Sequence, residues 1–251
     1  MTGNIRASIL PNDVSILPND VTLRPCLSHV SATLRQLFPA SVIVIERQAP
    51  GSLADLLPVE EQHVARARPK RRQEFAAGRS CARTALALLG VEPTVIPAAG
   101  DRQPIWPLGI AGSITHTAGF CAAAVARQAQ VRWLGLDTEV IGAPTPEVWT
   151  TLCRADELAW IHALPAAKWH AAVTLVFSAK EAFYKCQYPA TAEWLDFHDL
   201  RIDLPSADLS AGEFMVTPMR KINFAPETGL PAGRFAFHPP FVSTAVSVER
   251  R

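Results

Sequence analysis

The order of apolar and polar residues predicts strands and a long helix in the first half of the chain. Residues 42–46 are a short apolar run, which is typical of a buried strand. Residues 69–89 begin with a proline and are followed by Gly90, the usual boundaries of a helix. Residues 113–115 and 121–126 flank a glycine-containing turn, so they predict a pair of strands.

The second half repeats this mixture. Residues 132–139 are another strand-like run, and Trp169, Val173 and Phe177 recur at helical spacing within a helix predicted over 166–186. Short strands are expected over 200–204, 213–217, 234–237 and 241–248. The pattern therefore predicts an α+β protein. We expect an N-terminal arm over 1–21, one α+β half over 22–130 and a second over 131–251.

The predicted arm contains the heptapeptide SILPNDV twice in tandem, over 8–14 and 15–21. A seven-residue period is typical of coiled coils, but the proline in each copy blocks a continuous helix. A duplication within the arm is the simpler interpretation.

Composition indicates a globular protein with a sizeable core. Of 251 residues, 49% are hydrophobic and 19% charged, which excludes a disordered chain. The net charge of +1 argues against a general nucleic-acid binder. No stretch approaches membrane-spanning length, and no secretory signal pattern opens the sequence. The five cysteines include no CxxC pair, so we expect neither a disulfide framework nor a thiolate zinc site, and a reduced, cytoplasmic protein.

Two acids end the strand predicted over 132–139. Asp137 and Glu139 point to one face of that strand, about 6.6 Å apart along the backbone. A solvated strand end also commonly carries acids, and that interpretation stays open here. The apolar residues before them favour a strand that runs out of the core into a cleft.

A third acid and two lysines lie in the second long helix. Glu181 and Lys185 are four residues apart and share a face, and Lys180 precedes them. Such pairs are common on surfaces, and Ser178 with Glu181 also matches a capping box at a helix start. The apolar row that ends at Phe177 continues to Glu181, which favours a helix already running there. An acid on such an inward-facing row needs a partner.

Three converging carboxylates would need a positive partner. Two unit charges about 5 Å apart repel by roughly 3 kcal/mol at an effective dielectric of 20. A hard divalent cation such as Mg²⁺, which binds carboxylates, waters and phosphate oxygens, fits Asp137, Glu139 and Glu181. The neighbouring lysines favour a phosphorylated ligand at the same place.

Basic residues crowd the first long helix. The set comprises Arg66, Arg68, Lys70, Arg71, Arg72, Arg79 and Arg83. Of these, Arg72, Arg79 and Arg83 are nearly in phase on one face. A solvated helical face is the usual fate of such a run, and nucleic-acid binding is a second interpretation. Aromatic residues are few among the arginines, which favours a compact polyphosphate over a polymer.

Three residues outside this helix are candidates to join the basic group. Arg102 lies in a predicted turn, and Ser113 and His116 lie in a predicted strand and at its end. No Ser/His/Asp order of a hydrolase accompanies them. A lone histidine after a strand is usually structural, but at a strand end that faces the basic helix it can donate to a phosphate.

Together these segments resemble the 4′-phosphopantetheinyl transferases, in the group that activates siderophore, polyketide and peptide synthase carriers. Five motifs follow that family's order between about residues 66 and 194: RRQEF with GRSCARTAL (71–86), GDRQP with WP (100–107), GSITH (112–116), GLDTE (135–139) and FSAKEAFYK (177–185). Each motif alone is weak, and their common order carries the resemblance. One departure is Phe177, where the family often has tryptophan.

The resemblance implies two similar α+β halves related by a pseudo-twofold, with coenzyme A in the cleft between them. It implies that Asp137, Glu139 and Glu181 bind Mg²⁺ or Mn²⁺. The residues at positions that hold the nucleotide and its 3′-phosphate are Arg71, Arg79, Arg83, Arg102, Ser113 and His116, although helical phase favours Arg72 over Arg71. Lys180 and Lys185 correspond to lysines beside the pyrophosphate.

The implied reaction transfers the 4′-phosphopantetheine arm of coenzyme A to a serine of an apo acyl or peptidyl carrier protein. Glu181 is then the candidate acceptor of the serine proton, and Lys185 the candidate that stabilises the leaving phosphate. The two-half interpretation predicts that a monomer suffices. A carrier- or coenzyme-A-binding relative without transfer activity is one alternative, which the three intact acids argue against. A metal-dependent nuclease is another, which the helical position of Lys180 and Glu181 argues against.

Overall fold

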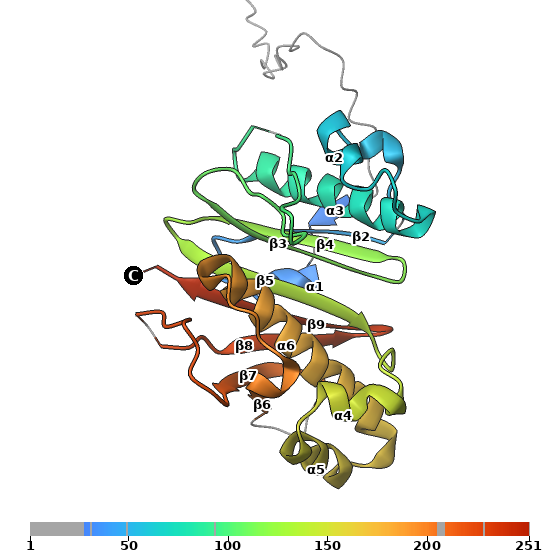
Figure 1. Ribbon diagram of the computed structural model, residues 1–251, viewed down its shortest axis with the longest axis vertical. Helices are drawn as coiled ribbons and strands as arrows, with labels where there is room; N and C mark the ends of the chain where they lie inside the picture. Colours follow the sequence, from blue (N-terminus) through green and yellow to red (C-terminus); the bar gives the residue numbers. More distant parts are fainter. Residues whose placement is uncertain are drawn as a thin grey trace, which may run out of the picture.

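The computed structural model describes residues 28–30, 32–48, 50–92, 94–204, 209–227 and 229–250. The tandem heptapeptide lies outside these residues. The described chain forms two antiparallel sheets, each covered by one long helix (Figure 1). The predicted α+β class is thereby confirmed.

The first sheet has four strands in the order β1-β2-β4-β3. These strands are β1 (Ser28–Val30), β2 (Ile43–Arg47), β3 (Ile110–Thr117) and β4 (Phe120–Arg127). The helices of this part are α1 (Ala32–Arg35), α2 (Pro58–Gln62) and α3 (Pro69–Leu88), with a 3₁₀ turn at Leu53–Asp55. Apolar side chains of α3, including Ala77, Cys81 and Leu86, pack on Ile45, Ala123 and Val125 of the sheet.

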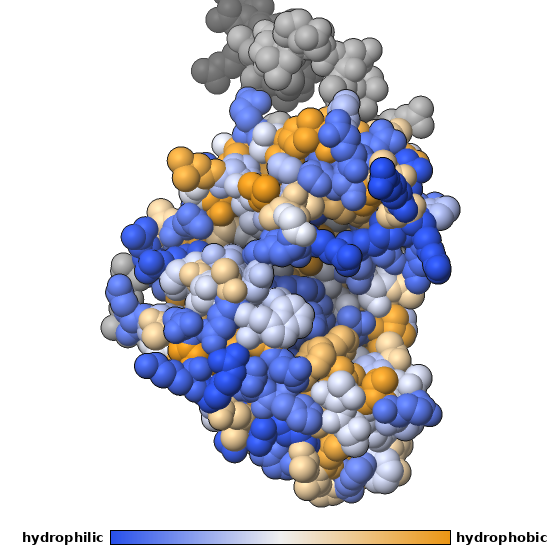
Figure 2. All heavy atoms as spheres, in the orientation of Figure 1, coloured by the Kyte–Doolittle hydropathy of each residue, from blue (hydrophilic) through white to orange (hydrophobic). Residues whose placement is uncertain are grey.

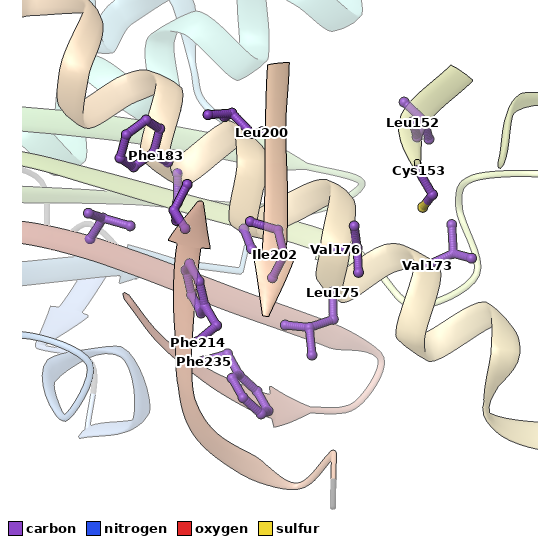
Figure 3. Close-up of a cluster of buried hydrophobic side chains, with 14 of the residues drawn as sticks. Leu152, Cys153, Val173, Leu175, Val176, Phe183, Leu200, Ile202, Phe214 and Phe235 are labelled. Atoms are coloured by element: carbon purple, nitrogen blue, oxygen red, sulfur yellow. The ribbon is translucent and has the colours of Figure 1, made fainter. Parts of the chain in front are cut away.

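The second sheet has five strands in the order β5-β9-β8-β7-β6. They are β5 (Val131–Val140), β6 (Leu200–Asp203), β7 (Ala211–Pro218), β8 (Gly233–His238) and β9 (Phe241–Glu249). The helices of this part are α4 (Trp149–Leu152), α5 (Ala155–Ala163) and α6 (Trp169–Thr191). Two 3₁₀ turns, Pro146–Val148 and Ala166–Lys168, precede α6, and a third, Phe197–Asp199, follows it. In Figure 3, Leu175, Val176 and Phe183 of α6 extend toward Ile202, Phe214 and Phe235 of the sheet.

A third apolar core lies between the two sheets. It joins Val44, Ala122 and Ala124 of the first sheet to Leu136 and Ala245 of the second. The molecule is therefore layered as helix, sheet, sheet, helix, with a core at each of the three junctions. This order brings one face of each long helix toward the region where the two sheets meet.

The two sheets meet at their edge strands, β3 and β5. The Ser113 hydroxyl accepts a hydrogen bond from the Leu136 backbone N–H at 3.1 Å, and the Thr115 hydroxyl accepts one from the Thr138 N–H at 2.9 Å. Side-chain hydroxyls thus satisfy backbone donors of β5 that have no strand partner on that side. Residues at the end of β3 are held next to the acids of β5 as a result.

The sequence predicted the two long helices and most of the strands, but it missed the shorter helices. The helices predicted over 69–89 and 166–186 are α3 and α6, and the predicted strands are β2 to β9 with somewhat different ends. Unpredicted were β1, α1, α2, α4 and α5, most of which are too short for a periodic pattern. No helix among the described residues is long and apolar enough to cross a membrane, and the face in Figure 2 mixes hydrophilic and hydrophobic side chains.

Gly135 lets α6 lie unusually close to β5. A Cβ at this position would collide with the carbonyl oxygen of Ala182 and would lie 2.8 Å from the backbone nitrogen of Cys186. Both of these atoms belong to the backbone of α6, so no side chain can move aside. The absence of a side chain at residue 135 therefore sets the distance between the acids of β5 and the helix.

We expect Gly135→Ala to lower the free energy of unfolding by about 1–3 kcal/mol, because overpacking forces helix and strand apart. Urea unfolding at equilibrium measures this change. Gly100→Ala is a matched control, since a Cβ there meets no atom within 4 Å. A Gly135→Ala protein as stable as the Gly100→Ala protein would show that α6 is not held by this contact.

Candidate functional site

A cavity of about 490 Å³ lies where the two sheets and the two long helices come together. Its lining comes from α3, from the 101–109 segment and from β3, β5 and α6. Among the predicted site residues, Arg71, Arg79, Arg102, Ser113, His116 and Lys185 line it. Both sheets therefore contribute to one binding space.

Arg71 and His116 form the end of the cavity beside α3. The Arg71 guanidinium donates to Nε2 of the His116 imidazole, and Glu74 lies 3.6 Å from Nδ1 of the same ring. Burial, with a contribution from the charge of Arg71, lowers the pKa of His116 to about 4. The ring is therefore neutral at physiological pH, and Arg71 supplies the positive charge.

Arg79 is the buried arginine of this end. Its Nε donates to the Ile96 carbonyl oxygen at 2.6 Å, and its guanidinium lies 4.1 Å from the centre of the Phe75 ring. Burial lowers the pKa of Arg79 to about 10, so the side chain stays charged at neutral pH. A buried guanidinium that keeps its charge is a strong anion site.

Arg102 enters the cavity from an exposed turn. Its backbone has φ of 73°, a left-handed conformation that is uncommon outside glycine. The turn is held because the Asp101 carboxylate accepts hydrogen bonds from the Gln103 backbone N–H at 3.1 Å and from the Gln103 side chain at 2.8 Å. The position of Arg102 is thus fixed by its neighbours.

Asp137 is the most enclosed of the three predicted acids. Its carboxylate accepts hydrogen bonds from the Ser178 hydroxyl at 2.8 Å and from the Lys185 ammonium at 2.6 Å. The Thr115 hydroxyl lies 3.4 Å from it. Ser178 lies within α6 and not at its start, which excludes the capping-box interpretation and confirms the interpretation from helical phase.

Glu139 and Glu181 are half-buried and electrostatically coupled to Asp137. Burial raises the pKa of Glu139 to about 7, and the charges of Asp137 and Glu181 add to this shift. Burial also raises the pKa of Glu181; Lys185 counteracts this and Asp137 reinforces it. The charges of these acids therefore act on one another, and their joint binding of one ion stays a prediction.

This group of acids fits a divalent cation. Burial raises the pKa of Glu139 to about 7 and also raises that of Glu181, so nearby positive charge would stabilise their ionised forms, and oxygen donors suit Mg²⁺. Within the described part of the chain, no three His, Cys, Asp or Glu side chains are arranged as a ready set of metal ligands. Lys185 lies against Asp137 instead and neutralises part of the charge.

Two predicted ligand residues point away from the cavity. Arg83 donates both to the fully buried Glu60, at 2.7 and 2.6 Å, and to the backbone of Asp55. Lys180 lies 2.6 Å from Glu157 in an ion pair that is almost fully buried. Neither basic residue lines the cavity. Asp137, Glu139 and Glu181 do not line it either, and Asp137 is linked to it through its ion pair with Lys185.

At the start of α3, helical phase favoured Arg72 over Arg71 as the residue that faces the ligand, and the structure contradicts this. Arg72, which phase favoured, bonds to Glu61 at 3.1 Å, whereas Arg71 lines the cavity. The reason is that Arg72 has an acid within reach on α2, and a phase argument within one helix cannot include that residue.

Sequence reasoning missed four residues that organise the site. Ser178 and Thr115 position Asp137, while Glu60 and Glu157 bind Arg83 and Lys180. Ser178 carried a usable signal, because it lies three residues before Glu181 on the same helix. Glu60 and Glu157 carried none that separates them from surface acids.

Comparisons with known proteins show the family to which the chain belongs. Residues 59–126 match the family model described as the 4′-phosphopantetheinyl transferase N-terminal domain, and residues 134–226 match the one described as the 4′-phosphopantetheinyl transferase superfamily. The chain is 38% identical over 200 residues to the 4′-phosphopantetheinyl transferase Svp of Streptomyces mobaraensis, an alignment that covers 77% of this chain and 78% of that protein.

Two further relatives extend the comparison. The 4′-phosphopantetheinyl transferase Npt of Nocardia iowensis is 41% identical over 155 residues, which cover 61% of this chain and 68% of that protein. Enterobactin synthase component D of Salmonella typhi is 39% identical over 119 residues, which cover 46% and 48%. From the two matched families and the extent of these similarities, this chain belongs to the 4′-phosphopantetheinyl transferases.

Proposed function

We propose that this chain transfers the 4′-phosphopantetheine arm of coenzyme A to a serine of an apo acyl or peptidyl carrier protein, with release of 3′,5′-ADP. The observation that supports this most directly is the arrangement along one cavity. Arg71, Arg79 and His116 lie toward α3, and Lys185 links the same cavity to Asp137. A polyphosphate that runs from the arginines to Lys185 brings its reacting phosphorus to the carboxylates.

The two helix-covered sheets support a fold of two similar halves related by a pseudo-twofold. We place the boundary between the two halves near Gln130, between β4 of the first sheet and β5 of the second. Coenzyme A then binds in the cavity between the halves, since residues of both sheets line it. Arg71, Arg79 and Arg102 bind its phosphates as charge-assisted donors.

Asp137, Glu139 and Glu181 hold a divalent cation, Mg²⁺ or Mn²⁺, in this proposal. When bound, that ion supplies charge neutralisation of the pyrophosphate and orients it. The residues themselves fit this task because burial and mutual repulsion raise the pKa of Glu139 and Glu181. The ion pair between Lys185 and Asp137 also supports the placement of positive charge beside these acids.

The transfer step uses two side chains of α6. The carrier serine hydroxyl attacks the β-phosphorus of coenzyme A and gives its proton to Glu181. A serine–phosphorus bond forms, and the bond from that phosphorus to the bridging oxygen breaks, so that 3′,5′-ADP leaves with the electron pair. Lys185 donates to the leaving phosphate and offsets its developing charge. The raised pKa of Glu181 makes it a better proton acceptor than an ordinary carboxylate.

The similarity to an enterobactin synthase component supports carrier domains of siderophore synthases as substrates. Carriers of polyketide and peptide synthases belong to the same chemical class, because each presents a serine for the arm. One chain builds the whole cavity, so a monomer suffices for the reaction.

Intact-protein mass spectrometry of an apo carrier tests the reaction itself. We expect the carrier to gain one phosphopantetheine arm when this chain, coenzyme A and Mg²⁺ are present, and no gain after chelation. A carrier with its serine replaced by alanine is the control. Absence of transfer across several carrier types, with coenzyme A bound, would refute the proposal.

Glu181→Gln should lower kcat by about 100-fold or more, since a positioned base contributes roughly 10²–10⁴-fold. Glu147→Gln, at an exposed position of the same half, is the matched control and should keep full activity. Continuous measurement of 3′,5′-ADP release gives both rates. Near-normal turnover by a folded Glu181→Gln protein would remove Glu181 from its role as base.

Asp137→Ala should abolish the Mg²⁺-dependent part of coenzyme A binding, because it removes the most enclosed acid of the group and frees Lys185. Isothermal titration with and without Mg²⁺ separates the two parts. Asp156→Ala removes an acid that is 46% exposed and paired with Arg154, and should leave the titration unchanged. An unchanged Mg²⁺ dependence in Asp137→Ala would exclude Asp137 as a ligand.

A further inference from the structure

Glu60 is a fully buried acid outside the cavity. It lies on α2, and its carboxylate accepts hydrogen bonds from the Leu57 backbone N–H at 3.0 Å and from the Ile96 N–H at 2.9 Å. Arg83 of α3 donates to both of its oxygens and also to the backbone of Asp55. One carboxylate thus joins a short helix, a long helix and the segment that leads toward Arg102.

Glu157 occupies the same kind of place in the other half. It is buried on α5 and accepts from the Arg154 backbone N–H at 2.8 Å and from the Ile202 N–H at 2.7 Å. Lys180 of α6 donates to it at 2.6 Å and to the Leu152 carbonyl at 2.9 Å. Short helix, long helix and strand are again joined by one acid.

The two clusters repeat at the same sequence spacings. The glutamate precedes its basic partner by 23 residues in both halves. It accepts from the backbone N–H three residues before it in both. The basic residue donates to a carbonyl 28 residues before it in both. Only the distance to the isoleucine differs, at 36 and 45 residues.

A buried ion pair of this kind is not retained for its net stability. Desolvation offsets much of the attraction between the charges, and an apolar replacement is often as stable. What such a cluster fixes is geometry, because donors from separate segments of the chain bind the two oxygens of each acid. The repetition of this geometry indicates the same structural task in both halves.

We propose that Glu60 and Glu157 are positioning residues for two different parts of the reaction: Glu60 for coenzyme A binding and Glu157 for the transfer step. This inference rests on the proposed roles of Arg79, Glu181 and Lys185. Both glutamates lie away from the cavity, so each acts through its neighbours.

Glu60 acts on Arg79 through Ile96. The Ile96 N–H is bound by Glu60, and the carbonyl of the same residue accepts from Arg79 Nε at 2.6 Å. Arg83, the ionic partner of Glu60, lies one helical turn after Arg79 on α3. Glu60 therefore fixes both the helix that carries Arg79 and the carbonyl that orients its guanidinium.

Glu157 acts on α6. Lys180 directly precedes Glu181, and its inward ion pair with Glu157 sets the rotation of the helix about its axis. With Lys180 held on one side, Glu181 and Lys185 face β5, where Lys185 bonds to Asp137. Loss of the ion pair frees this rotation at the residues that act on the serine and the leaving phosphate.

Glu60→Gln and Glu157→Gln test this division, since glutamine keeps the size and one carbonyl oxygen but removes the charge. We expect Glu60→Gln to raise KM for coenzyme A about tenfold with kcat within about twofold, the scale of one charge-assisted hydrogen bond. We expect Glu157→Gln to lower kcat about tenfold with KM within about twofold. Steady-state kinetics at saturating carrier gives both parameters.

Glu61→Gln is the matched control, because it removes a neighbouring charge that is 51% exposed and bound to Arg72. It should change neither parameter. Arg83→Lys and Lys180→Arg keep the positive charge, so they should retain most of the function that the two glutamine variants lose. They also serve as milder variants if either glutamine variant fails to fold. In that case we expect Arg83→Lys to raise KM for coenzyme A and Lys180→Arg to lower kcat, each by less than the glutamine variant of its partner.

The inference would be overturned if both glutamine variants changed KM equally or changed kcat equally. It would also be overturned if they lowered the melting temperature but left KM and kcat normal. Arg79→Ala separates it from the proposed function. If Arg79→Ala leaves KM for coenzyme A unchanged, the binding role itself fails. If Arg79→Ala raises KM while Glu60→Gln does not, only the positioning role of Glu60 fails.

Discussion

Lys185 bonds to Asp137 in the middle of three acids that would otherwise repel one another, and the geometry of the whole site depends on that contact. The 2.6 Å distance is reached because Gly135 has no side chain to keep α6 away from β5. One ammonium neutralises one charge, and burial with mutual repulsion raises the pKa of Glu139 to about 7 and that of Glu181 above its usual value. Added positive charge would lower both pKa values, which is the basis of the proposal that these acids hold a divalent cation.

The chain places its charges in two different settings. Arg71, Arg79 and Lys185 line the cavity, whereas Arg83 and Lys180 are paired with the buried acids Glu60 and Glu157. The same residue types serve both purposes, so a basic residue near a motif does not by itself mark a ligand contact. What separates the two groups is the partner: a buried glutamate on a short helix that accepts from several backbone N–H groups.

This difference sets what sequence alone can predict. The long helices and the strands followed from apolar periodicity, and the acids of β5 and α6 followed from alternation and helical phase, because these signals act within one element. Three basic residues are held by acids of other elements. Arg72 pairs with Glu61, Arg83 with Glu60 and Lys180 with Glu157. Those acids belong to α2 and α5, which have too few residues to show a period. Contacts between elements decided each case in which the sequence was insufficient.

The junction of the two sheets sets the position of Asp137 relative to the end of the cavity at Arg71 and His116. Both meeting strands are edge strands, and Ser113 and Thr115 join them through hydroxyl groups instead of a backbone ladder. Residues of both strands line the cavity beside this junction. Strand alternation then turns His116, the residue after Thr115, away from β5 and toward Arg71. β3 therefore contacts Asp137 through Thr115 on one face and Arg71 through His116 on the other, so the pleat of this strand sets the separation between Asp137 and the end of the cavity that we propose binds phosphate.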